Sequence, residues 1–216
     1  MELFLGPITL PGPLRLQSET ERQISQSILW FLNRSVSLLQ AAGLVDVSGE
    51  PGLLLPEDLE QAQKAGKAAA DCLPKTALHG RAQVGYLRSI TQEGLLVKPL
   101  KCETSTVLQD TCGLGHTFLC TLAANALEKG HRVQLCPALT DPQRLEAVLL
   151  PELGAAWVSD RTGITGPGIS LDSIPDPERR AALEDAMQRD SEMQASLIRQ
   201  AEAQMQMAGI LYRVIE

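Results

Sequence analysis

Residues 105–160 alternate short apolar runs with helix-forming stretches, and this alternation constrains the fold more than any other feature of the sequence. The runs STVL, RVQLC and AAWVS each have a length typical of buried strands. A helix is expected over about 116–129, and Asp141 with Pro142 predicts a second, short helix ending near Leu150. Strand, helix, strand, helix, strand in this order predicts an α/β fold with a parallel sheet and right-handed crossovers.

Helix-forming regions flank this segment on both sides. A helix over about 18–43 begins with the capping-box signature SETE, and a second helix is expected over about 57–72. The stretch 176–216 is longer than an ordinary globular helix, so it predicts either one long rod or a hairpin broken near 189–191. We therefore expect long helical extensions, arranged as a helical hairpin or in a coiled-coil-like way, beside the sheet.

The composition narrows the class of protein. Hydrophobic residues make up 44% of the 216 residues, so the chain has enough apolar material for a core. The net charge of −7 argues against nucleic-acid binding and against an anionic-membrane surface, and no apolar run reaches the roughly 18 residues that span a bilayer. The start MELFLGPITLPG lacks the basic region of a secretory signal, and the cysteines are odd in number. We expect a reduced, cytoplasmic protein.

Two parts of the chain are partly similar to each other. FLGPITLPGPLRL, from Phe4, and YLRSITQEGLLVKPL, from Tyr86, share an aromatic residue, a leucine and the pattern Ile-Thr-x-x-Gly. A repeat of this kind predicts that the tail of one structural unit is followed by a second, fuller unit.

The segment QDTCGLGHTFL lies between a predicted strand and a predicted helix, which is the setting of a phosphate-binding loop. Such a loop has the pattern Gly-x4-Gly-Lys-[Ser/Thr], in which lysine reaches the phosphates and the hydroxyl holds Mg²⁺. Gly115 and Thr117 match this pattern, whereas Asp110 replaces its first glycine and His116 replaces its lysine. Gly113 and Gly115 are expected to serve the backbone geometry. Residues 110–117, the phosphate-loop segment below, thus form a degenerate Walker A motif.

Four stretches together carry a resemblance to a known family. They are SITQEG, TVLQDTCGLGHTFL, LEKGHRVQLCPALTDPQRLEAVLLPELGAAWVSD and the long helical tail. From about Tyr86 to the C-terminus the chain resembles an uncharacterised bacterial family of ATPase-like proteins built from two tandem P-loop repeats. The resemblance implies a P-loop NTPase-like parallel sheet with flanking helices. It divides the chain into a mainly helical remnant of a first repeat (1–85), a degenerate P-loop domain (86–175) and a C-terminal helical extension (176–216).

The resemblance also implies a nucleotide site, made of Gly113, Gly115, His116 and Thr117. Thr117 and Asp160 would hold Mg²⁺, only if ATP or GTP binds. Histidine is shorter than lysine and mostly neutral at pH 7, since its ordinary pKa is about 6.5. If Asp110 points inward, its charge opposes a phosphate by roughly 4 kcal/mol at a separation of about 4 Å. We therefore expect no catalytic residue and no firm cofactor, and a non-hydrolysing protein with a scaffold or regulatory role.

Three alternatives stay open. The chain could be a weak ATP- or GTP-binding protein, or a Mg²⁺-dependent NTPase that uses His116 and Thr117. It could instead be a purely helical interaction module, forming a homodimer or binding a protein partner through 18–72 and 176–216. A metal or redox site at Cys112, His116 and Cys120 is the weakest alternative, because zinc sites show tighter paired spacing. His79 and His131 are expected at the surface.

Overall fold

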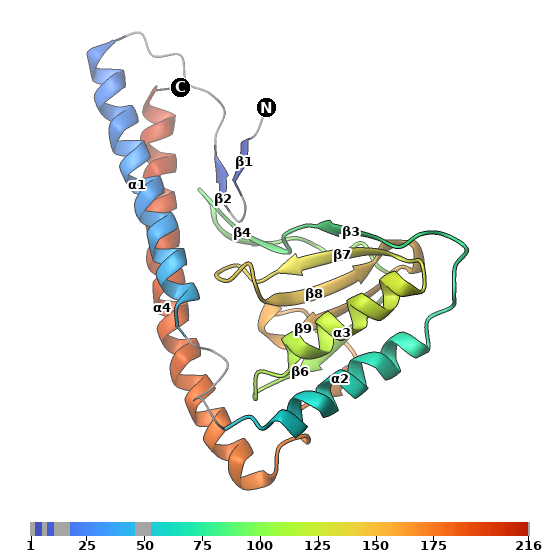
Figure 1. The fold of residues 1–216 in the computed structure, drawn as a ribbon. Helices are drawn as coiled ribbons and strands as arrows, with labels where there is room; N and C mark the ends of the chain where they lie inside the picture. The colour runs from blue at the N-terminus through green and yellow to red at the C-terminus, as the bar shows by residue number, and fades with distance from the viewer. Residues whose placement is uncertain (1–2, 6–7, 11–17, 46–52, 216) are drawn as a thin grey trace.

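The computed structural model describes residues 3–5, 8–10, 18–45 and 53–215, and it has two parts (Figure 1). One is an α/β body, in which helices flank a six-stranded, mostly parallel sheet. The other is a helical arm, formed by the pairing of α1 and α4. The helices are α1 (Glu19–Gly43), α2 (Pro56–Asp71), α3 (Gly115–Glu128) and α4 (Pro177–Ile215). The strands are β1 (Leu3–Leu5), β2 (Ile8–Leu10), β3 (Arg81–Val84), β4 (Arg88–Thr91), β5 (Gly94–Val97), β6 (Thr104–Gln109), β7 (Arg132–Pro137), β8 (Leu145–Leu150), β9 (Ala155–Ser159) and β10 (Gly168–Ser170).

The six-stranded sheet has the order β10-β6-β9-β8-β7-β3. Its neighbouring strands are parallel except at β8, which is antiparallel to both β7 and β9. The expected helix over 141–150 is therefore wrong, and the alternation is not wholly parallel. The sequence LEAVLL is rich in helix formers, but insertion between two strands buries most of it, and burial outweighs propensity. Asp141 closes a turn instead, since its Oδ1 accepts from the Gln143 amide at 2.8 Å.

Helices α2 and α3 pack against each other beside the sheet (Figure 1). The helix expected over about 116–129 is confirmed as α3. Its buried residues belong to the main core, with members from β6, β7 and β8. The buried members on α3 are Phe118, Leu119, Leu122, Ala123 and Ala126.

The helical arm joins segments that are far apart in the sequence. α4 is one continuous helix of 39 residues, which decides between the rod and the hairpin. Ile28, Leu32 and Leu39 of α1 share a buried cluster with residues of α4, and the Ser35 hydroxyl donates to the Ala201 carbonyl at 2.9 Å. The capping box predicted at the start of α1 is confirmed. Long helical segments therefore do form, and they stabilise each other by packing.

A second, four-stranded sheet has the order β1-β2-β4-β5. In it β2 pairs in parallel with β4, so that Ile8 lies opposite Ile90. These strands come from the two similar stretches of sequence, which thus lie side by side. Ile90 is buried in the core of the arm, so this small sheet also links the arm to the body.

The part of the chain before residue 86 is shared between the arm and the body. α1 belongs to the arm, whereas α2 packs on α3 and β3 extends the six-stranded sheet beside β7. Within the described residues, no helix is both long and apolar enough to cross a bilayer.

Candidate functional site

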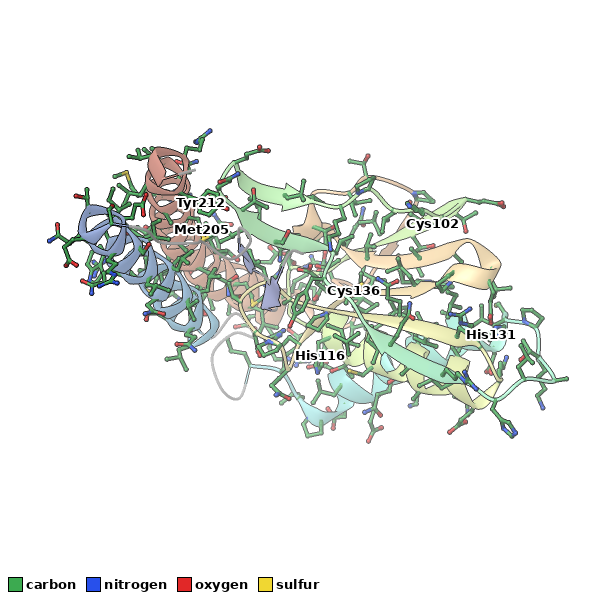
Figure 2. All side chains as sticks on the ribbon, turned by 90° about the horizontal axis from the view of Figure 1, so that it is seen from above. Cys102, His116, His131, Cys136, Met205 and Tyr212 are labelled. Carbon is green, nitrogen blue, oxygen red and sulfur yellow. The ribbon has the colours of Figure 1, made fainter. Side chains whose placement is uncertain are left out.

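The phosphate-loop segment lies where β6 ends and α3 begins. In parallel sheets this carboxyl edge is the usual place for a ligand. Figure 2 shows His116 where the body faces the arm, and His131 at the far end of the body. The phosphate-loop segment thus lies at the edge of the sheet where parallel-sheet proteins usually bind their ligands.

Asp110 points into the phosphate-loop segment. Its side chain is buried, with the residue only 6% exposed. The carboxylate accepts from the amides of Leu114 at 2.8 Å and Gly115 at 2.7 Å, at the start of α3. Burial raises the pKa of Asp110, while the two amides and the nearby Arg161 act in the opposite direction. A carboxylate of the chain itself therefore uses backbone donors that a phosphate loop offers to its ligand.

The two glycines of the segment serve the backbone, as expected. Gly113 has φ +83°, which side chains other than glycine rarely adopt. A Cβ at Gly115 would lie 2.9 Å from Asp110 Oδ2. The lack of a side chain at Gly115 thus lets the Asp110 carboxylate approach the helix.

His116 does not take the role of the missing lysine. Its Nδ1 accepts from the Leu145 amide at 3.1 Å, so this nitrogen is unprotonated and the imidazole is held against the start of β8. Burial lowers the pKa of His116, and the charge of Arg144 lowers it further, whereas Asp141 raises it. The imidazole therefore acts as a neutral hydrogen-bond acceptor that joins α3 to the sheet.

The two predicted Mg²⁺ ligands lie in different settings. Asp160 Oδ2 accepts from the Asp110 amide at 3.3 Å, which places this carboxylate at the start of the phosphate-loop segment. Thr117 lies in the first turn of α3, and its carbonyl accepts from the Thr121 hydroxyl. Among the described residues, no hydrogen bond or ion pair joins Thr117 to Asp160. The structure therefore brings Asp160, but not Thr117, into contact with Asp110.

A cavity of about 320 Å³, the arginine cavity below, lies beside the phosphate-loop segment. It opens at the junction with the arm, where the Gln194 side chain donates to Ala42 and Thr140. Its charged lining residues are Arg88, Asp110, Asp141, Arg144, Glu146 and Arg161. Among these six residues, the sequence patterns gave a role only to Asp110 and Asp141, because no spacing in the sequence relates the three arginines to one another. The one available signal was that Arg161 directly follows Asp160.

Arg88 and Glu146 form an ion pair in the lining of this cavity. Arg88 Nε donates to Glu146 Oε2 at 2.8 Å, and Arg88 also donates to the Arg161 carbonyl at 3.4 Å. Glu146 is only 3% exposed, and burial raises its pKa, while Arg88 and the Leu139 amide act in the opposite direction. Arg88 therefore ties the small sheet to the body and neutralises a buried carboxylate.

The other predicted ligand groups do not converge. Cys112 is buried in the core, whereas Cys120 is exposed and lies 3.6 Å from His116 Nδ1. Within the described residues, no cluster of three histidines, cysteines or acids has the geometry to hold a metal ion. His79 is exposed as expected, but the expectation for His131 is wrong.

His131 is fully buried, because its two ring nitrogens have partners inside the fold. Nδ1 contacts Glu152 Oε1 at 2.9 Å, and Nε2 contacts the Pro74 carbonyl at 2.7 Å. This histidine therefore joins the loop after α2 to the end of β8, far from the phosphate-loop segment.

Comparison of this chain with protein-family models, with curated protein sequences and with solved structures finds no match.

Proposed function

We propose that this chain is a P-loop NTPase-like protein that has lost nucleotide hydrolysis and works as a scaffold or regulator. The hydrogen bonds from the Leu114 and Gly115 amides to the Asp110 carboxylate carry the proposal. They use the donors at the start of α3 that would otherwise attract a phosphate. The loop is thus closed by its own side chain.

The charges around the loop also oppose a nucleotide. A phosphate that approached these amides would meet the carboxylate of Asp110, at a cost of roughly 4 kcal/mol for two charges about 4 Å apart. The lysine that would offset this cost is absent, and the neutral imidazole of His116 is bonded to Leu145. Both changes weaken binding of the same ligand.

A thermal-shift titration with Mg-ATP, Mg-GTP and their diphosphates tests this proposal. The native chain is compared with a restored loop that carries Asp110→Gly and His116→Lys. His116→Lys alone is the matched control, because it supplies the lysine but keeps the carboxylate. A ligand at about 100 times its dissociation constant stabilises the native state by roughly 2.7 kcal/mol. We expect this stabilisation only in the restored loop, and stabilisation of the native chain by micromolar nucleotide would overturn the proposal.

The helical arm supports the scaffold role, because it presents large apolar side chains to solvent. On α1, Trp30 is 55% exposed and its neighbour Leu29 is similarly exposed. On α4, Ile210 and Val214 are exposed near the end of the helix. We propose that the arm binds a second copy of the chain or another protein, since exposed apolar patches often mark such surfaces.

Sedimentation over a range of concentrations tests for self-association through the arm. A dimer that forms with increasing concentration in the native chain should be lost in Trp30→Glu. Leu78→Glu is the matched control, because Leu78 is also an exposed apolar side chain but lies in the loop before β3. A native chain that is monomeric at all concentrations would contradict the homodimer and leave a different protein as the partner.

A further inference from the structure

The arginine cavity gathers three guanidinium groups, and two of them form no ion pair among the described residues. Arg88 is paired with Glu146. Arg144 and Arg161 form no ion pair with any residue in 3–5, 8–10, 18–45 or 53–215. Arg161 is half-buried, and its only side-chain hydrogen bond in this part of the chain is a long contact of 3.8 Å with the sulfur of Met187. Two half-buried cations thus share a cavity without an ion-pair partner in the described part of the chain.

The acidic groups of the lining are already occupied. Asp110 accepts from two backbone amides, Asp141 accepts from the Gln143 amide, and Glu146 is bonded to Arg88. Each carboxylate is therefore held by another group of the fold, and none of them is positioned as the partner of Arg144.

The electrostatic surroundings of Arg161 are mixed. Asp110 and Asp160 lie near enough to favour its charged form, whereas Arg144 and Arg88 oppose it, and burial lowers the pKa of Arg161. Burying a cation beside other cations is unfavourable unless an anion joins them. The arrangement is therefore that of a site which an anion would complete.

One hydrogen-bond acceptor in the cavity is also unused. Glu146 Oε2 is bonded to Arg88, and the Leu139 amide lies near the same carboxylate. Oε1 is nevertheless buried and makes no hydrogen bond of ordinary geometry within the described residues. A buried acceptor without a donor costs free energy, so it points to a missing donor. A hydroxyl group on the ligand of Arg144 and Arg161 would supply that donor.

We propose that the arginine cavity binds a small phosphomonoester that carries a hydroxyl group. The phosphate lies between Arg144 and Arg161, and the hydroxyl donates to Glu146 Oε1. A phosphomonoester matches two guanidinium groups in charge, because it is a dianion near neutral pH, and planar guanidinium groups bind phosphate oxygens in pairs. The cavity volume of about 320 Å³ suits a small ligand.

The inference goes beyond the proposed function and does not depend on it. Arg144 lies in the turn before β8, and Arg161 lies in the single turn after β9, so neither belongs to the phosphate-loop segment. A nucleoside triphosphate would bring more negative charge toward Asp110 and Asp160. A single phosphate bound by the arginines avoids the amides that Asp110 occupies.

Isothermal titration of the whole chain with glycerol 3-phosphate tests the proposal. Arg144→Met and Arg161→Met should each weaken binding about 10-fold or more, which is the loss of one hydrogen bond to a charged group. Arg81→Met is the matched control, because Arg81 is exposed on β3 and its amide is bonded to His131 at the far end of the body. No binding by the native chain, or an equal loss in Arg81→Met, would overturn the proposal.

Two further arms separate the possible reasons for a loss. Thermal unfolding of each variant shows whether it is folded, and Arg161→Gln gives a second, polar replacement. Methyl phosphate lacks the hydroxyl, so it should bind more weakly than glycerol 3-phosphate, and equal affinity would contradict the role of Glu146. Binding of Mg-ATP by the native chain, measured separately, would overturn the proposed function but not this inference.

Discussion

The phosphate-loop segment and the arginine cavity share the side chain of Asp110, yet they differ in how their charges are satisfied. In the loop, the carboxylate of Asp110 and two backbone amides satisfy one another. In the cavity, Arg144 and Arg161 lie together with no ion-pair partner among the described residues. The charged and polar groups of the phosphate-loop segment are thus satisfied by one another, whereas Arg144 and Arg161 of the arginine cavity form no ion pair within the described residues.

Hydrogen-bond donors mark a binding site only when the fold leaves them unused. The free energy that a ligand gains from a donor depends on whether the donor already has a partner. Interactions that are complete within the protein should therefore contribute to stability, whereas incomplete ones should contribute to binding.

The largest effect is expected at the one paired arginine of the cavity. Arg88→Met leaves the buried carboxylate of Glu146 without its partner, and should lower the free energy of unfolding by about 3–5 kcal/mol. Chemical denaturation measures this loss. Arg88→Met combined with Glu146→Met should recover most of it, because the pair is then replaced by apolar groups. If Arg88→Met is as stable as the native chain, the ion pair with Glu146 does not stabilise the fold, and Arg88 behaves like Arg144 and Arg161.

A smaller loss is expected in the loop. Asp110→Ala leaves the Leu114 and Gly115 amides without an acceptor, so the free energy of unfolding should fall by about 2 kcal/mol. Asp110→Asn keeps one acceptor oxygen and should lie between the native chain and the alanine variant. If denaturation shows that Asp110→Ala is as stable as the native chain, the loop is not held closed by its own carboxylate.

A change near zero is expected for the unpaired arginine. Arg161→Met should leave the free energy of unfolding unchanged or raise it, within about 1 kcal/mol, because this half-buried cation forms no ion pair among the described residues and Arg144 and Arg88 oppose its charge. The same denaturation series measures it. If Arg161→Met lowers the free energy of unfolding as much as Arg88→Met does, Arg161 has a stabilising partner inside the fold. The arginine cavity would then not differ from the phosphate-loop segment in how its charges are satisfied.

The smallest effect is the pH dependence that His116 contributes. Its pKa is lowered in the folded chain, so the unfolded chain binds the proton more readily. The contribution of the neutral imidazole is fully present above the ordinary pKa of about 6.5, and is lost as the pH falls through that value toward the lower pKa of the folded chain. Between about pH 7.5 and about pH 5.5, the native chain should lose more stability than His116→Gln. If the stability of the native chain and that of His116→Gln change with pH in parallel, His116 does not act as a neutral imidazole whose pKa is lowered by the fold.

Much of the secondary structure follows from local signals. The capping box of α1 and the helices expected over about 57–72 and 116–129 depend on signals within a few residues, and the structure confirms them. The strand AAWVS has the predicted bounds as β9. Such elements are predictable because the interactions that define them are close in the sequence.

The α/β class, most of the helices and the position of the phosphate-loop segment between a strand and a helix could be predicted from the sequence. The three-dimensional contacts were needed to establish that LEAVLL is a strand, that His131 is buried, that Asp110 caps its own loop and that three arginines meet in one cavity. Arg88, Arg144 and Arg161 come from separate elements, and β8 owes its conformation to its neighbours in the sheet. Their roles depend on burial and on partners distant along the chain, and local propensity carries no information about either.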